Sequence, residues 1–292
     1  MLVTAAEAGA WTLADTVVNR MGLGAMRLTA DPAPDRALAV LHRAIELGVN
    51  HIDTAAFYVS PGGTLGIDDG PFRSANGLIR EALHPYPDDL VIAAKVGPGE
   101  NAAGEWQEAL TADQLRFQVE QNLTMLGRDV LDVVYLRVIS RTALDFRFEA
   151  LAALREEGLI RHLGLSNVRI GDVDALSAIA PVVCVQNSYS LDHRRTDDEL
   201  VAFCGQRGIA FVPFFAIAGT GRESGATSSH SEAVVAVANA HDITAHQVRL
   251  AWTLHQGAHV LAIPGTSDPA HLEANIAAGA VRFSDEELAL LG

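Results

Sequence analysis

The stretch Gly48-Val49-Asn50-His51-Ile52-Asp53-Thr54-Ala55-Ala56-Phe57-Tyr58 decides how this chain folds. A helix-like run ends at Gly48, a residue type that commonly ends helices, and residues 49–54 form a short apolar run typical of a buried strand. Asp53 therefore lies near the carboxyl end of this strand, and Tyr58 lies just beyond it. Burying an aspartate at the end of an apolar strand costs free energy unless the carboxylate has a partner. The stretch thus predicts a partner for Asp53 elsewhere in the chain.

Lys95 is the predicted partner of Asp53. The chain has 21 Lys plus Arg, and Lys95 is its only lysine, at the end of the next apolar run, 90–95. A buried ammonium can lose its charge or change the acidity of a neighbour, whereas a guanidinium stays charged. An acid, a phenol and an amine at the ends of neighbouring strands form a proton-transfer set. The alternative is a lysine that reaches solvent from a strand end, but the presence of Asp53 and Tyr58 favours the proton-transfer set.

The composition is that of a globular chain with a surplus of negative charge. It has 292 residues, 49% of them apolar, and a formal net charge of -15 at pH 7. This charge disfavours nucleic acid and anionic membranes as partners, and we expect neither. No apolar run approaches the roughly 18 residues of a membrane-spanning helix, and the N-terminus lacks a basic stretch followed by an apolar one. We therefore expect a cytoplasmic protein in which Cys184 and Cys204 are buried, reduced thiols.

Strand-like and helix-like segments alternate along the chain. The strand-like runs are short and continuously apolar, which is typical of a parallel sheet covered on both faces. Eight strands, each followed by a helix, predict an α/β fold, a (β/α)8 TIM barrel, which we expect to occupy residues 1–292 as one domain. A short N-terminal β-hairpin, Trp11–Leu13 and Thr16–Asn19, precedes it. The predicted strands are 21–26, 50–54, 90–95, 131–136, 160–165, 182–186, 209–213 and 259–263, and the predicted helices are 35–47, 73–84, 111–126, 143–157, 171–179, 195–207, 245–256 and 269–278.

An open, doubly wound sheet is the alternative architecture. It would need a Gly-rich turn of the dinucleotide-binding kind after the first strand, and none follows residues 21–26. In a barrel, the chemistry lies on the loops after the strands. Three long loops, 59–72, 97–110 and 214–230, all follow predicted strands. Since long loops in a compact barrel are usually functional, we expect them to border the face that carries the acid, the phenol and the amine.

Several motifs together resemble those of the aldo-keto reductases. Each motif is weak alone, but they occur in the order and spacing of the family and extend over about residues 16–291. In chain order they are the stretch 48–58, Lys95, Gly164-Leu165-Ser166-Asn167, Val185-Gln186-Asn187 and Ile263-Pro264-Gly265-Thr266-Ser267. Within the family, the stretches that most resemble the bacterial pyridoxal reductases are Asp132–Val138, Pro213–Phe215 and Pro264–Leu272.

The resemblance implies a nicotinamide cofactor that gives hydride to an aldehyde or ketone, with Tyr58 as the general acid. A phenol has a reference pKa of about 10 and donates its proton poorly at neutral pH. The charged Lys95 would stabilise the phenolate, and Asp53 would hold Lys95 in place and charged. Where the family usually has a catalytic histidine, at the end of the fourth strand, this sequence has Arg137. We assign Arg137 to substrate orientation and electrostatics, including contact with an ionised ring hydroxyl; a structural ion pair is the alternative.

The resemblance also implies a site for the nicotinamide ring. Ser166, Asn167 and Gln186 would hydrogen-bond its carboxamide. Phe214 would stack under the ring where the family has a tyrosine, since phenylalanine keeps the π face and loses only the hydroxyl. Considered alone, Ser166 and Asn167 more often cap the next helix, and Phe214 would more often belong to the core.

The adenosine end of the cofactor is the weakest match. Gly265, Thr266 and His271 stand where the family commonly has Lys-Ser and an arginine that bind the 2′-phosphate. Thr266, Ser267 and Asn275 can still donate hydrogen bonds, and the helix that starts near residues 268–269 would offer backbone amides to an anion. We expect NADPH, with a 2′-phosphate affinity that is lower or depends on pH through His271, and NADH is the alternative cofactor.

A small-molecule carbonyl compound is the expected substrate. Phe57 and Trp106 are the predicted walls of its pocket, although Trp106 could equally fasten a surface loop. Pyridoxal, a small aromatic aldehyde, is the preferred candidate, while the 59–72 insertion leaves open a specialised ketone or sugar. A cofactor-binding regulatory subunit with little turnover is a further alternative. The 11 histidines show no metal-ligand spacing, so no metal is predicted, and the oligomeric state is not predicted.

Overall fold

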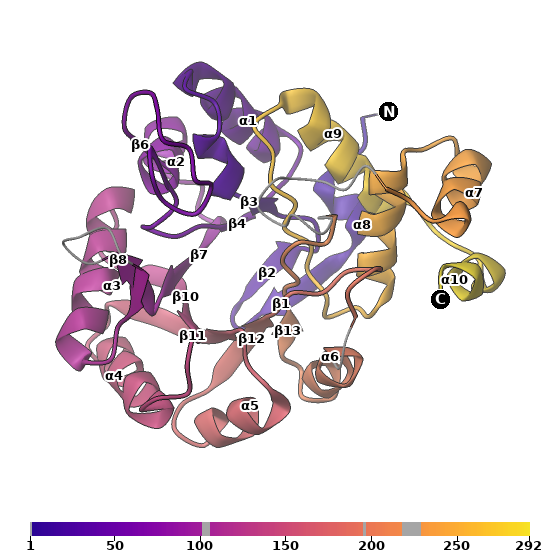
Figure 1. Ribbon diagram of the computed structural model, residues 1–292. Helices are drawn as coiled ribbons and strands as arrows, with labels where there is room; N and C mark the ends of the chain where they lie inside the picture. The colour runs from indigo at the N-terminus through magenta and orange to yellow at the C-terminus, as the bar shows by residue number, and fades with distance from the viewer. Residues whose placement is uncertain (1, 101–105, 195–196, 218–228) are drawn as a thin grey trace.

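The computed structural model describes residues 2–100, 106–194, 197–217 and 229–292. Seven parallel strands form one sheet that curls around the centre of the molecule, and helices cover its outside (Figure 1). This arrangement confirms the predicted α/β barrel. In spatial order the strands are β13 (Ala210–Phe211), β12 (Val182–Gln186), β11 (Ile160–Ser166), β10 (Leu131–Arg137), β7 (Val91–Val96), β4 (His51–Asp53) and β3 (Leu23–Gly24).

The predicted eighth strand, 259–263, closes the barrel without forming a regular ladder. Val260 makes an isolated parallel bridge with Phe211 of β13, and Ala262 makes one with Met21, just before β3. The backbone N–H of Gly22 donates to the carbonyl oxygen of Ala262 at 2.8 Å. The first and the last strand segments are thus shorter than predicted, but together they join the two edges of the sheet.

The predicted helices are all present, with ends that differ by a few residues. Their boundaries follow ordinary capping chemistry; Thr111 and Gln114, for example, form a capping box at the start of α3, and Gly127 ends that helix in the left-handed conformation. The helices are α1 (Pro34–Glu46), α2 (Ala75–Leu83), α3 (Ala112–Leu126), α4 (Leu144–Glu156), α5 (Ile170–Ser177), α6 (Asp197–Gln206), α8 (Ala245–His255) and α9 (Pro269–Ala277), with 3-10 turns η1 (Ala5–Ala8), η2 (Met26–Thr29) and η4 (Ala278–Ala280).

Two helices were not predicted, α7 (Glu232–His241) and α10 (Asp285–Leu291). They lie outside the ring, where α7 packs beside α8 and α10 packs beside α7 (Figure 1). Both carried a start signal in the sequence. Ser231 caps α7, and Ser284 forms a capping box with Glu287 at the start of α10. They were missed because the prediction placed one helix after each strand of the barrel, whereas α7 and α10 are additional to that alternation.

Short antiparallel hairpins close the bottom of the barrel and shape its rim. The predicted N-terminal hairpin is confirmed as β1 (Ala10–Leu13) and β2 (Thr16–Asn19), whose Leu13 and Val18 pack into the barrel interior. The 59–72 insertion starts in β5 (Val59–Ser60), which pairs with β6 (Arg73–Ser74). The 97–110 loop contains β8 (Pro98–Glu100) and β9 (Trp106–Glu108). Residues 101–105 of that loop and 218–228 of the 214–230 loop lie outside the described residues.

Buried residues fill both the barrel and the layer between sheet and helices. Cys184 and Cys204 are buried and free, as predicted. No helix among the described residues is both long and apolar enough to span a membrane. Within the same residues, no group of three or more His, Cys, Asp or Glu side chains is arranged to hold a metal ion.

Candidate active site

A buried ion pair lies at the carboxyl ends of β4 and β7. The Lys95 ammonium donates to Oδ1 of Asp53, and it also donates to the Thr54 carbonyl oxygen at 3.2 Å. Asp53 is 5% exposed and Lys95 3%. The other carboxylate oxygen of Asp53 accepts a hydrogen bond from Nε2 of Gln186, at the end of β12, at 2.7 Å. The predicted partner of Asp53 is therefore in place, and three strands hold the pair.

Tyr58 lies directly against this lysine. The Lys95 Nζ is 4.9 Å from the centre of the Tyr58 ring, and Tyr58 is 7% exposed. Burial by itself would lower the pKa of Lys95, but the charges of Asp53 and Tyr58 and the hydrogen bonds to both side chains outweigh it and raise that pKa above its ordinary value. Lys95 is accordingly a charged ammonium at neutral pH, placed next to a phenol.

A cavity of about 550 Å³ opens above these residues at the carboxyl end of the barrel. This is the end at which barrels of this kind carry their chemistry. Most of the site residues predicted from the sequence line this one cavity, although they come from segments far apart in the chain. They are Asp53, Tyr58, Lys95, Arg137, Ser166, Gln186, Phe214, Gly265, Thr266, Ser267, His271 and Asn275.

Arg137 ends β10, directly opposite Ser166 of β11, and faces the cavity. Its side chain is partly exposed. Among the described residues, its guanidinium makes no ion pair, in contrast to Arg128 and Arg147, which both pair with carboxylates. The structural ion pair that the sequence left open for Arg137 is thus not formed with any described carboxylate.

Three predicted residues lie outside the lining of this cavity. The Asn167 side chain donates to the Val138 carbonyl oxygen at 2.7 Å. The Phe57 ring lies edge-to-face with those of Tyr58 and Trp106, at centroid distances of 5.2 and 5.3 Å. Phe57 also lines a second cavity of about 530 Å³ beside α3. The roles predicted for these three side chains stay predictions.

Besides Thr64 of the 59–72 insertion, sequence reasoning missed four polar residues that line the cavity: Arg27, Thr244, His246 and Gln247. Arg27 lies in η2, directly after the first strand. The rule that chemistry follows the carboxyl ends of barrel strands could have found it, had it been applied to that strand. The other three belong to the start of α8, which follows the unpredicted α7. Arg27 adds a permanent cation to the site, and the site predicted from the sequence did not include it.

The start of α9 differs from the expectation that it would offer backbone amides to an anion. Pro269 has no N–H, and the Asp268 carboxylate already accepts hydrogen bonds from the N–H groups of Ala270 and His271. These bonds lower the pKa of Asp268, so this helix start carries a negative charge of its own, paired with Arg36 at 2.5 Å. Asp268, which caps α9, therefore competes with any bound phosphate for these backbone amides.

Comparisons with known proteins agree with the geometry. The model of the aldo/keto reductase family matches residues 20–291. A pyridoxine 4-dehydrogenase of Escherichia coli is 40% identical over 294 residues, which cover 96% of each chain. A methylglyoxal reductase of the same organism is 30% identical and covers 95% of this chain and 91% of its own.

A solved structure supports the same assignment. An aldo-keto reductase from Klebsiella pneumoniae, crystallised in complex with NADPH, superimposes with a TM-score of 0.78 at 29% identity, covering 94% of this chain and 90% of its own. Family and fold thus agree with the resemblance predicted from the sequence motifs. This chain belongs to the aldo/keto reductase family and is an oxidoreductase.

Proposed function

We propose that this protein is an NADPH-dependent carbonyl reductase that acts on a small aromatic aldehyde, with pyridoxal as the best candidate, and that Tyr58 is its general acid. One observation carries the proposal: a buried, charged lysine lies against a phenol at the floor of a cavity large enough for a small substrate. Elsewhere in the chain, arginines supply the positive charge.

The reaction follows from the positions of these side chains. A bound nicotinamide would supply the hydride to the carbonyl carbon, and the carbonyl oxygen, which gains negative charge, would then need a proton. Tyr58 donates that proton, and the Lys95 ammonium stabilises the phenolate left behind. Asp53 and Gln186 hold Lys95 in place. Proton donation by a positioned acid contributes about 10²- to 10⁴-fold to a rate.

The cavity lining suits a nicotinamide dinucleotide. Ser166 and Gln186 lie at strand ends and line the same cavity as Tyr58. Because the Gln186 amide group donates to Asp53, its carbonyl oxygen is available to accept from a carboxamide. The Phe214 ring offers a face for stacking. At the far end, Arg27 and His271 are the groups with which a 2′-phosphate would pair, which favours NADPH over NADH.

Pyridoxal is favoured by the pyridoxine 4-dehydrogenase relative and by Arg137. A guanidinium that no described carboxylate pairs with, in the lining of the cavity, suits a substrate that carries its own anionic oxygen next to the aldehyde. The ionised ring hydroxyl of pyridoxal is such a group. The apolar part of the lining that the nicotinamide does not use, which includes Pro213 and Ile217, would contact the aromatic ring of the substrate.

The test is a substrate panel followed by NADPH absorbance: pyridoxal, a neutral aromatic aldehyde, methylglyoxal and a ketose. We expect the highest kcat/KM for pyridoxal. A higher value for methylglyoxal or for the ketose would replace pyridoxal with that substrate class. NADPH binding without turnover of any carbonyl compound would overturn the proposal in favour of a regulatory subunit.

A further inference from the structure

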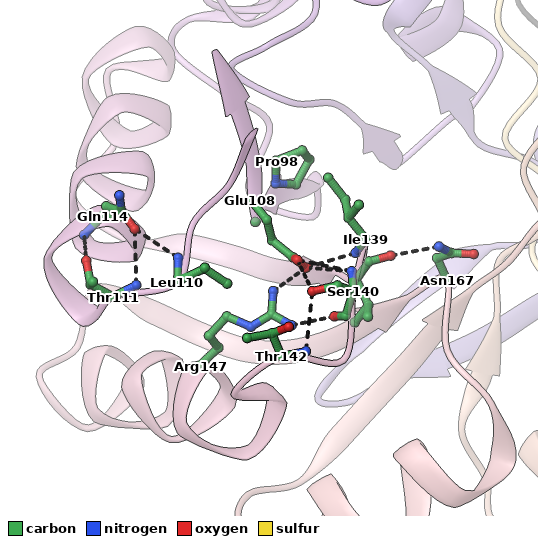
Figure 2. Close-up of polar contacts among 12 residues, drawn as sticks. Pro98, Glu108, Leu110, Thr111, Gln114, Ile139, Ser140, Thr142, Arg147 and Asn167 are labelled. Atoms are coloured by element: carbon green, nitrogen blue, oxygen red, sulfur yellow. Dashed lines mark hydrogen bonds and ion pairs between the residues drawn. The ribbon is translucent and has the colours of Figure 1, made fainter. Parts of the chain in front are cut away.

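A carboxylate on the rim hairpin reaches across to the loop that follows β10. Glu108, the last residue of β9, accepts hydrogen bonds from the backbone N–H groups of Ile139 and Ser140, each at 3.0 Å, and from the Ser140 hydroxyl (Figure 2). It also pairs with the guanidinium of Arg147 in α4, which is 0% exposed. Arg147 in turn donates to the Ser140 carbonyl oxygen at 2.8 Å. One side chain therefore gathers two backbone amides, a hydroxyl and a buried cation.

The segment held in this way begins with a residue of the active site. Arg137 lines the cavity, and Ile139 and Ser140 follow it directly. From the other side, the Val138 N–H donates to the Ser166 carbonyl oxygen at 2.9 Å, and the Val138 carbonyl oxygen accepts from Asn167. The backbone after Arg137 is thus fixed between β11 and Glu108, with Asn167 at the edge of the network in Figure 2.

The hairpin that carries Glu108 also touches the surroundings of the general acid. Trp106, two residues earlier in β9, packs edge-to-face on Phe57, which packs edge-to-face on Tyr58. The hairpin therefore has two contacts at the active site. One leads through aromatic rings to Tyr58, and the other leads through Glu108 to the backbone beside Arg137.

We infer that Glu108 is a positioning residue, which sets the place of the Arg137 guanidinium relative to Tyr58 through the 138–140 backbone. The inference rests on the proposed function. Hydrogen bonds from backbone N–H groups to an ionised carboxylate are among the strong ones. Burial acts to raise the pKa of Glu108, but the hydrogen bonds from Ser140, Arg147 and Ile139 outweigh it and lower that pKa, so the carboxylate is ionised at neutral pH. Small misplacements of a group that orients a substrate cost about 10²-fold in rate.

A purely structural role is the competing explanation, since the loss of Glu108 alone would leave Arg147 buried and unpaired. Two double variants separate the roles: Glu108→Gln/Arg147→Met and Glu108→Ala/Arg147→Met. Both lack the ion pair, but only the glutamine keeps an acceptor for the amides of Ile139 and Ser140. We expect the glutamine variant to keep kcat/KM for pyridoxal within about threefold of wild type, and the alanine variant to lose about 10- to 100-fold.

Two further measurements exclude a general effect on the fold. NADPH affinity, measured by fluorescence quenching, should be unchanged in both double variants. In an Arg137→Met background, the Glu108→Ala/Arg147→Met pair should cause no further loss, because the guanidinium that Glu108 positions is gone.

Asp132→Asn is the matched control, since Asp132 is a buried carboxylate that also binds a backbone N–H and an arginine, at the opposite end of the barrel. It should lower the melting temperature and leave kcat/KM unchanged.

Equal kcat/KM of the two double variants would overturn the inference, and so would a full additive loss in the Arg137→Met background. If the alanine pair does not fold, Glu108→Asp replaces it. This variant keeps the charge beside Arg147 but shortens the reach to the amides, so we expect a several-fold loss that again disappears in the Arg137→Met background. A wild-type enzyme that reduces no carbonyl compound would overturn the proposed function itself, whereas an active wild type with indifferent Glu108 variants would overturn this inference alone.

Discussion

Two buried aspartates, Asp53 of β4 and Asp132 of β10, contact opposite ends of β7 and do different work in this barrel. At the carboxyl end of β7, Asp53 pairs with Lys95. At the amino end, Asp132 accepts from the Ile92 N–H at 2.9 Å and pairs with two arginines, Arg128 and Arg161. Both carboxylates are buried and both have cationic partners, so neither burial nor pairing distinguishes a catalytic pair from a structural one.

The cation and its surroundings make the difference. Lys95 lies against Tyr58 beneath an open cavity, where an ammonium can stabilise a phenolate. The guanidiniums beside Asp132 stay charged and only hold the backbone and its neighbours. This division matches the general rule that the carboxyl end of such a barrel carries chemistry and the amino end carries stability.

Removing the phenol should have the largest effect at the carboxyl end. In Tyr58→Phe we expect kcat to fall about 10²- to 10⁴-fold, because the hydroxyl that we assign as the proton donor is gone. NADPH affinity should stay within twofold, since the ring and its packing remain. Stopped-flow turnover together with cofactor titration checks both values. Wild-type turnover in this variant would show that Tyr58 is not the acid.

Comparing Lys95→Met with Asp132→Asn would test the contrast between the two ends directly. Lys95→Met leaves Asp53 buried without its cation, which should cost about 3–5 kcal/mol of stability and most of the turnover. Asp132→Asn weakens hydrogen bonds to charged groups and should cost about 1–3 kcal/mol with no change in kcat/KM. Urea unfolding and steady-state kinetics measure the two effects. If both variants lost turnover to the same degree, the division of labour would be wrong.

The pH dependence of the Asp53–Lys95 pair follows from the raised pKa of Lys95. The folded protein binds that proton more tightly than the unfolded chain does. The pair therefore contributes its full stability below the unfolded lysine pKa of about 10.4 and loses it only as the pH rises through the higher folded value. The stability difference between wild type and Lys95→Met should thus be constant from pH 6 to 9 and shrink above about pH 10.5.

Arg137→His should have a smaller effect that depends on the substrate. If the guanidinium binds an anionic ring oxygen, kcat/KM for pyridoxal should fall about 10- to 100-fold, the worth of a hydrogen bond between charged groups. A neutral aromatic aldehyde should lose only a few-fold in the same assay. Equal losses for the two substrates would remove the contact with a substrate anion and leave Arg137 a general electrostatic role.

The smallest effect is expected at the adenosine end, where Arg27 and His271 line the cavity. Arg27→Ala should weaken NADPH binding about tenfold at both pH 6 and pH 8 and leave NADH binding unchanged, because only NADPH carries the 2′-phosphate. His271→Ala should weaken NADPH binding mainly at pH 6, where imidazoles gain charge. Calorimetric titration of both cofactors measures this. Tighter binding of NADH than of NADPH by the wild type at both pH values would overturn the cofactor assignment.

The sequence predicted most of the elements but not the details of their ends. Strand and helix positions followed from apolar runs and spacing, and residues such as Asp53, Lys95 and Ser166 could be placed at strand ends because parallel strands all end on one side. The helices α7 and α10 were missed because they are additional to the alternation of one strand and one helix on which the prediction was based. Arg27 was missed because a single polar residue after a Gly-rich strand carries no periodic signal.

The sequence alone determined three features of this protein: the barrel, the family motifs, and the pairing of the only lysine with an aspartate at a strand end. Contacts between segments far apart in the chain were decided only by the tertiary structure. Gln186 binds Asp53 across 133 positions, and Glu108 holds the backbone after Arg137. The physical reason is that spacing and residue type report burial and secondary structure, whereas which donor meets which acceptor depends on how the closed barrel brings its loops together.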